Sequence, residues 1–230
     1  MSDDARPLPS ATARAIARAY RPAHPLGSYW DYFYVRGKLS SDPLYPGIVD
    51  ALRGTSAPVL DLGCGLGLLA HALRDAGLAL PYRGVDIDAG KIARAARAAT
   101  RAGLGETGFA RLDLARGLPA HRGSVAVLDV LQFVPRQAHD GILDGAIAML
   151  APGAKLVIRT GFDDGGSRAR VTRAVDVFSR VLGWMNAAPR HYPEREALCA
   201  RLADAGLRVE VDSLSGDTPF NNWRVVAHAP

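Results

Sequence analysis

The sequence predicts an α/β fold: a doubly wound, mostly parallel seven-stranded sheet that ends in a C-terminal antiparallel hairpin. Three features predict it. Short apolar runs alternate with helix-length segments, glycines end most of those segments, and the last two apolar runs are separated by only a few residues. The chain of 230 residues, 48% of them hydrophobic, is long enough to bury the core of one such domain.

The segments before the first predicted strand have helical character. Residues 11–20 (ATARAIARAY) predict a helix that Pro22 ends, and residues 43–53 predict another that stops before Gly54. An aromatic cluster at residues 29–34 lies between these two helices. Tyr29, Phe33 and Gly37 have helical spacing, which predicts that their side of the segment is buried.

Strands and helices then alternate along the chain. Strands are expected at residues 58–62, 82–86, 108–112, 125–130 and 154–160. Between them, residues 66–76, 89–102 and 136–150 have the apolar spacing of helices. Strands joined in this way are parallel, and such a sheet binds ligands beyond the carboxyl ends of its strands.

The last part of the chain breaks this alternation. Residues 167–184 and 194–205 predict helices, and residues 207–213 and 222–228 predict two strands. The connection between these two strands contains the turn sequence SGDTP and is too short for a parallel crossover. We therefore expect the final two strands to form an antiparallel pair.

The composition is that of an ordinary soluble domain, and the cytoplasm is the expected location. No run of about 18 apolar residues predicts a membrane span, and the first ten residues lack the apolar segment of a secretion signal. The net charge of +5 is compatible with nucleic acid, but the basic residues are scattered. A basic stripe on the helix at 89–102 is explained by a solvated face. Neither Cys64 nor Cys199 has metal-ligand spacing, so no metal is expected.

A glycine-rich turn follows the first predicted strand, in the segment VLDLGCGLGLLA at 59–70. Gly65 to Ala70 match the dinucleotide pattern G-x-G-x-x-A, whereas Asp61 followed by three alternate glycines matches a different pattern. An acidic residue inside the strand weighs against a dinucleotide-binding site. A dinucleotide-binding fold would also leave the terminal hairpin unexplained. Asp86, at the end of the second strand, suits the ribose hydroxyls of any nucleoside cofactor.

Five motifs follow one another in order between residues 46 and 161. They are VLDLGCGLG at 59–67, GVDID at 84–88, LDL at 112–114, VLDVL at 127–131 and LAPGAKLVI at 150–158. In this order they resemble the motifs of class I S-adenosylmethionine-dependent methyltransferases. The resemblance implies a Rossmann-like methyltransferase fold, whose seventh strand is antiparallel, and S-adenosylmethionine as the cofactor.

The resemblance implies cofactor contacts for the residues Asp61, Gly63, Cys64, Gly65, Gly67, Asp86, Ile87, Asp113, Leu114 and Asp129. Asp61 would meet the positively charged amino group, and Asp86 would accept from both ribose hydroxyls. Ile87 and Leu114 would pack on the adenine ring, and Asp113 would accept from its amino group. Asp61 could instead be a buried carboxylate that caps the turn, and Asp113 a plain turn residue. Asp88 is expected to cap the next helix.

The resemblance also divides the single domain, residues 1–230, into three parts. Residues 1–45 are expected to form an N-terminal helical lid, residues 46–161 the cofactor-binding core, and residues 162–230 the acceptor-site helices and the terminal hairpin. Aromatic residues are frequent in the two outer parts. They favour a small, partly apolar or aromatic acceptor. Oxygen is the atom expected to be methylated.

Two other kinds of function stay open. The fourth motif lacks the Pro-Pro element of enzymes that methylate amines of DNA bases, but methylation of RNA or another macromolecule is an alternative. A regulatory protein that binds the cofactor without transferring methyl groups is a second alternative. The segments RGKL at 36–39 and DPLY at 42–45 resemble small bacterial methyltransferases found with fatty-acid or aryl-polyene pathways.

Methylation at oxygen removes a proton, so a general base is expected near the acceptor. His139 and His191 lie in segments that border the carboxyl ends of the predicted strands, and a neutral imidazole with a pKa of about 6.5 is a suitable base. Tyr34, in the expected lid, is a third candidate. The alternative for each histidine is an exposed surface position, and catalysis by alignment alone needs no base.

Overall fold

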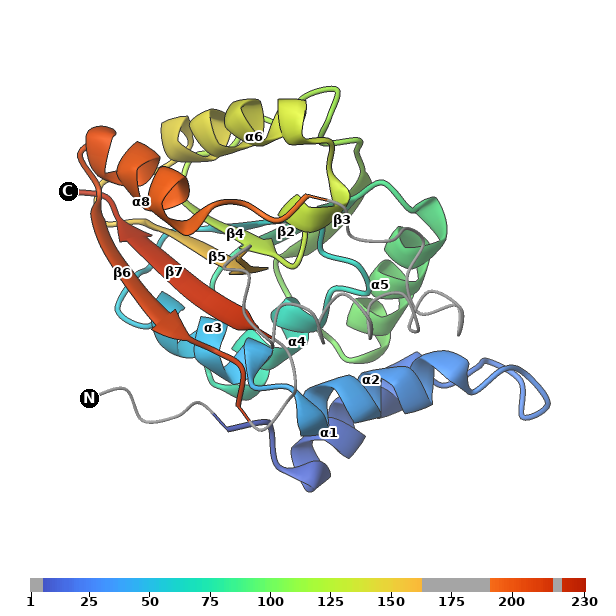
Figure 1. Cartoon of the computed structure of the whole chain (residues 1–230). Helices are drawn as coiled ribbons and strands as arrows, with labels where there is room; N and C mark the ends of the chain where they lie inside the picture. The colour runs from blue at the N-terminus through green and yellow to red at the C-terminus, as the bar shows by residue number, and fades with distance from the viewer. Residues whose placement is uncertain (1–5, 163–190, 217–220) are drawn as a thin grey trace.

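The computed structural model describes residues 6–162, 191–216 and 221–230 (Figure 1). The strands are β1 (Val59–Leu62), β2 (Tyr82–Asp86), β3 (Thr107–Arg111), β4 (Ser124–Leu128), β5 (Lys155–Gly161), β6 (Arg208–Ser213) and β7 (Asn222–His228). The α-helices are α1 (Ser10–Ala17), α2 (Trp30–Ser41), α3 (Leu44–Leu52), α4 (Leu68–Asp75), α5 (Ala89–Arg101), α6 (Arg136–Ala148) and α8 (Arg195–Asp204). Two single turns of 3-10 helix are η1 (Arg18–Tyr20) and η2 (Leu131–Phe133).

The seven strands form one sheet in the order β3-β2-β1-β4-β5-β7-β6. The pairs among β1 to β5 are parallel, and β7 pairs antiparallel with both β5 and β6. The predicted fold class is confirmed, including the antiparallel hairpin. The chain order reverses between β1 and β4, which is the place where a doubly wound sheet binds its ligand. The helix predicted at 167–184 lies outside the described residues.

Helices cover both faces of the sheet (Figure 1). On one face, Ile142 of α6 and Leu202 of α8 are buried against apolar strand residues. On the other face, Leu52 of α3 and Leu73 of α4 form a second buried cluster. Within the described parts of the chain, no helix combines the length and the apolar character that crossing a membrane requires.

The sequence predicts only an aromatic cluster where the structure has helix α2. Just three residues of this helix, Tyr32, Val35 and Leu39, are buried, so its apolar stripe is narrow. Its remaining face carries glycine, lysine and serine, which weaken a periodic pattern. The prediction that the side of Tyr29 and Phe33 is buried is wrong: these side chains are 37% and 59% exposed, because the buried side of α2 is the one that carries Val35.

The segment that contains α1, η1 and α2 is fastened to the core by polar contacts as well as apolar ones. The Tyr20 hydroxyl donates to the carbonyl of Leu66 at 2.8 Å. Arg94 of α5 forms an ion pair of 3.0 Å with Asp31 of α2. Arg101 of α5 donates to the Arg21 carbonyl. The basic stripe of α5, expected to be a solvated face, therefore holds the N-terminal segment in part.

Candidate active site

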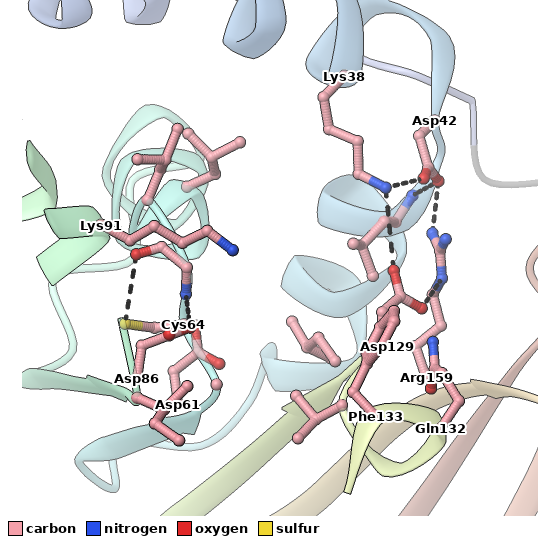
Figure 2. A pocket seen from close by; sticks show the side chains of 18 of the residues that line it. Lys38, Asp42, Asp61, Cys64, Asp86, Lys91, Asp129, Gln132, Phe133 and Arg159 are labelled. Carbon is pink, nitrogen blue, oxygen red and sulfur yellow. Dashed lines mark hydrogen bonds and ion pairs between the residues drawn. The ribbon is translucent and has the colours of Figure 1, made fainter. Parts of the chain in front are cut away.

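A cavity of about 840 Å³ lies beyond the carboxyl ends of β1, β2, β4 and β5, with α2 as a further wall (Figure 2). Figure 2 shows two groups of side chains on opposite sides of it. The glycine wall consists of the residues Asp61, Gly63, Cys64, Gly65 and Asp86. The ion-pair wall consists of the residues Lys38, Asp42, Asp129 and Arg159. This is the position in which a parallel sheet binds ligands.

The glycine turn brings backbone rather than side chains to the cavity. Gly63, Gly65 and Gly67 have φ values of +81°, +57° and +72°, which glycine adopts without a steric penalty. A Cβ on Gly63 would lie 2.3 Å from a methyl carbon of Val130. Gly65 lines the cavity, whereas Gly67 does not and instead packs closely against Phe109 at the start of α4. The turn therefore requires glycine for its shape at all three positions.

The Asp86 carboxylate ties the glycine turn to the segment that follows β2. One oxygen accepts from the Gly65 N–H at 2.9 Å, and the other accepts from the Asp88 N–H at 2.9 Å. Both oxygens keep capacity for further hydrogen bonds, since a carboxylate offers about four acceptor sites. Asp88 accepts from the N–H groups of Gly90 and Lys91. Its predicted role as the cap of the next helix is confirmed.

Asp61 is buried at the end of β1 with one oxygen satisfied and one not. The Tyr82 hydroxyl donates to Oδ2 at 2.6 Å, whereas Oδ1 is buried without a hydrogen-bond partner. Burial raises the pKa of Asp61 to about 7, although the Tyr82 hydrogen bond acts to lower it. A buried unpaired oxygen is costly, so this site favours a ligand group that donates a hydrogen bond or carries positive charge.

The other predicted cofactor residues also border the cavity. Cys64, Ile87, Asp113 and Leu114 all line it. Ile87 is 58% exposed, which leaves a large apolar surface at the rim for a flat ligand group. The Asp113 carboxylate also accepts from the Ala115 N–H at 3.0 Å, as expected of a turn residue. Its second oxygen is not committed to this turn.

The ion-pair wall joins α2 to the strand ends. Lys38 contacts Asp42 at 2.6 Å, and Arg159 of β5 contacts the other oxygen of Asp42 at 2.5 Å. Arg159 Nε lies 3.0 Å from Asp129 Oδ1, an ion pair whose geometry makes no hydrogen bond. Lys38 Nζ lies 3.9 Å from Asp129 Oδ2. Two cations and two anions thus alternate around this wall (Figure 2).

These contacts hold Lys38, Asp42 and Arg159 in their charged forms. Burial acts to raise the pKa of Asp42, but Lys38 and Arg159 hold it far below its usual range. Burial acts to lower the pKa of Lys38, but the Asp42 carboxylate outweighs this effect and raises it. Burial likewise opposes the charge of Arg159, and Asp129 and Asp42 raise its pKa. These three groups therefore do not titrate near neutral pH.

Asp129 holds its place on this wall by an unusual backbone conformation. Its φ of +57° is left-handed, which few residues other than glycine adopt. Its N–H donates to the Arg159 carbonyl at 2.9 Å, so backbone and side chain both contact Arg159. Strained residues of this kind gather at functional sites.

The sequence predicts Asp129 as a cofactor contact, but it does not identify Lys38, Asp42 and Arg159 as residues of the site. One signal was present: Arg159 interrupts the apolar run LVIRTG of a strand buried on both faces. A charged residue in such a strand needs a partner. The partner is 117 residues away in the chain, and nothing local identifies it.

The structure separates the three candidate bases. Tyr34 lines the cavity on α2. His139 does not: it is buried, and its Nε2 lies 2.7 Å from the Leu131 carbonyl and 3.1 Å from the Val134 carbonyl. His191 is not part of the cavity wall either, although its neighbour Tyr192 is. The geometry therefore brings Tyr34 to the cavity and leaves His139 and His191 outside it.

A comparison with protein families finds one match. Residues 59–153 match a family described as a methyltransferase domain. This span includes both β1 with its glycine turn and β4 with Asp129. A search of curated proteins found no match.

Solved structures with the same fold are methyltransferases of several kinds. An O-methyltransferase family protein from Burkholderia thailandensis has 21% identity and a TM-score of 0.61, over 86% of this chain and 59% of that one. Magnesium protoporphyrin IX methyltransferase from Synechocystis PCC 6803 has 18% identity and a TM-score of 0.64, over 93% and 92%. The N-methyltransferase NodS from Bradyrhizobium japonicum WM9 has 18% identity and a TM-score of 0.60, over 95% and 98%. The latter two were crystallised with S-adenosylhomocysteine.

Proposed function

We propose that the chain is a class I S-adenosylmethionine-dependent methyltransferase and that it methylates a hydroxyl oxygen of a small, partly apolar or aromatic acceptor. S-adenosylmethionine supplies an electrophilic methyl group on a sulfonium ion. The chain's part is to bind both reactants, align them and keep water out.

The residues of the glycine wall fit this cofactor. The unpaired, buried Oδ1 of Asp61 is an acceptor for a cationic amino group. Asp86 keeps acceptor capacity toward the cavity for ribose hydroxyls, and the glycine turn allows close approach of a ligand. Ile87 and Leu114 provide apolar surface for an adenine ring, with Asp113 as an acceptor beside them. We therefore propose that these residues make the cofactor contacts that the sequence predicts for them.

One observation supports a small acceptor: the glycine wall, the ion-pair wall and several aromatic side chains all line a single cavity of about 840 Å³. Tyr34, Tyr45, Phe133 and Tyr192 line that second half. The whole cavity lies within the roughly 300–1,000 Å³ of small-molecule sites. Such a space suits an aryl ring beside the cofactor better than a folded macromolecule.

The three parts of the domain have matching roles in this proposal. Residues 1–45 cover the acceptor end through α2, residues 46–161 carry the cofactor contacts, and residues 162–230 complete the acceptor site and the sheet. If residues 1–45 act as a lid over the acceptor site, deleting residues 1–40 should abolish turnover while cofactor binding stays measurable. Full activity of the truncated protein would show that α2 has no part in the acceptor site.

The test is methyl transfer by the purified protein to sets of hydroxyaryl, acyl and amine compounds, with products identified by mass spectrometry. A methylated hydroxyaryl product supports the proposal, and NADH should not compete with S-adenosylhomocysteine in calorimetry. Transfer to amines alone, or to RNA with strong salt dependence, contradicts it. Cofactor binding with no turnover for any acceptor class would support a regulatory role instead.

A further inference from the structure

The ion-pair wall contains one gap between opposite charges. Lys38 Nζ and Asp129 Oδ2 both belong to residues that line the cavity, and they stand 3.9 Å apart. That distance exceeds the roughly 2.7–2.9 Å of a charge-assisted hydrogen bond. Each group is anchored on its other side, Lys38 by Asp42 at 2.6 Å and Asp129 by Arg159 at 3.0 Å.

We propose that Lys38 and Asp129 together hold the hydroxyl group that is methylated, with the ammonium donating to its oxygen and the carboxylate accepting its proton. An oxygen about 2.8 Å from both atoms fits across this gap. A hydroxyl group is the simplest group that both donates and accepts at a single atom. This inference rests on the proposed methylation at oxygen and deepens it.

The charge balance of the wall specifies a neutral acceptor. Lys38 and Arg159 are matched by Asp42 and Asp129, and these are the only charged side chains among the described residues on this side of the cavity. An anionic acceptor would place a second negative charge beside Asp129, and a cationic acceptor would place a second positive charge beside Lys38. A neutral phenol or enol leaves the alternation of charges intact, and the aromatic side chains nearby favour an aryl ring.

The arrangement also accounts for the proton. As the bond between the acceptor oxygen and the methyl carbon forms, the carbon–sulfur bond breaks and the sulfur keeps the electron pair. The hydroxyl proton moves to the Asp129 carboxylate and from there to water. Lys38 stabilises negative charge on the oxygen while this happens. Because Asp129 accepts the proton, this step needs no histidine. Tyr34 lines the same cavity one helical turn before Lys38 on α2.

The experiment compares compounds of the same shape with and without the hydroxyl group. The dissociation constants of 4-chlorophenol, 4-chlorotoluene and 4-chloroaniline are measured by calorimetry on the full chain saturated with S-adenosylhomocysteine. The proteins are wild type, Lys38→Met, Asp129→Asn and Lys38→Arg. Arg36→Met serves as the control because it removes a positive charge from the exposed side of the same helix.

Wild type should bind 4-chlorophenol at least about tenfold more tightly than 4-chlorotoluene, since hydrogen bonds to charged groups are worth that much or more. Lys38→Met and Asp129→Asn should each reduce this preference to about threefold or less. Lys38→Arg should restore part of it, and Arg36→Met should leave it unchanged. A wild-type circular dichroism spectrum would show that the variants are folded.

Two results overturn the inference in different ways. A hydroxyl preference that survives in both Lys38→Met and Asp129→Asn means that the hydroxyl is held elsewhere, while methylation at oxygen stands. Equal binding of the three compounds by wild type, or preference for 4-chloroaniline together with its methylation, removes the proposed oxygen acceptor and the inference with it.

Discussion

The two walls of the cavity differ in how the chain builds them. The glycine wall is local: the Gly65 N–H and the Asp86 carboxylate that holds it are 21 residues apart. The ion-pair wall is assembled at long range, because Arg159 and Asp42 are separated by 117 residues. In the proposed function, the first wall presents backbone and carboxylates to the cofactor and the second presents charged side chains to the acceptor. Under that proposal, specificity for the acceptor depends on residues that only the complete fold brings together.

The largest effect is expected from breaking the ion-pair wall. Arg159→Met removes the buried cation that contacts both the buried Asp42 and the partly buried Asp129, and leaves Lys38 as their charged partner. This should lower the free energy of unfolding by about 3–5 kcal/mol. Urea denaturation measures it. Arg53→Met is the matched control, because its pair with Asp50 is exposed and should cost about 1 kcal/mol or less. Similar losses for both variants would show that the wall is not a desolvated unit.

A smaller loss is expected from the glycine wall. Gly63→Ala forces a positive φ on alanine and drives a Cβ against Val130, so we expect a loss of about 2–3 kcal/mol of stability. Gly54→Ala is the control, since Gly54 has a similar φ of +79° but no atom within 4 Å of the Cβ position. The double variant Gly63→Ala with Val130→Ala should recover part of the loss. No difference between Gly63→Ala and Gly54→Ala would mean that the contact with Val130 is irrelevant.

Next in size is the effect of Asp86 on the cofactor. Asp86→Ala should weaken S-adenosylhomocysteine binding by about 1.5–3 kcal/mol, roughly 10- to 150-fold, because it removes a charged acceptor and loosens the glycine turn. Asp88→Ala should cost about 1 kcal/mol of stability through its cap and leave affinity nearly unchanged. Calorimetry and urea denaturation separate the two. Equal affinities of the two variants would contradict the assignment of the ribose to Asp86.

The smallest effect is the pH dependence of cofactor binding through Asp61. It contrasts this residue of the glycine wall with Lys38 and Asp42 of the ion-pair wall, which stay charged near neutral pH. The pKa of Asp61 is about 7 in the folded protein, so a cationic amino group must displace a proton at lower pH. Affinity for S-adenosylhomocysteine should therefore fall about tenfold, or about 1.4 kcal/mol, from pH 8 to pH 6. Asp61→Asn should bind more weakly and lose this pH dependence. A wild-type affinity that is flat over this range would contradict the role of Asp61.

The same pKa has a consequence for stability with the opposite sign. The folded protein keeps a proton on Asp61 up to about pH 7, whereas the unfolded chain releases it near the ordinary value of 3.8. Stability from this group is therefore full below that lower value and lost as pH rises through 7. Asp61→Asn should unfold at higher urea than wild type at pH 8, although it binds the cofactor less well. The ionised carboxylate that a cationic amino group needs is thus the form that costs stability in the protein without ligand.

The sequence predicts the glycine wall well because each of its residues is marked by its neighbours. A glycine turn after an apolar strand, and an acidic residue at the next strand end, are visible within VLDLGCGLG and GVDID. All seven strands are predicted as well, because each is a short apolar run bounded by turn residues or by a helix-length segment. Helix α2 is not, because only three of its residues are buried. The sequence predicts His139 as a base or an exposed residue, but its Nε2 contacts the backbone carbonyls of Leu131 and Val134. The turn η2 brings these carbonyls to the ring, and no local pattern indicates that contact.

The position of β7 has a consequence for how the molecule folds. β7 lies between β5 and β6 although it comes after both in the chain, so β6 has no strand to pair with until β7 is in place. Until then β5 presents an open edge of alternating N–H and carbonyl groups along an apolar strand, which is a template for unwanted pairing with other chains. We expect β6 and β7 to form a hairpin first and dock as a unit. Slow docking of that hairpin would be the step at which nascent chains aggregate.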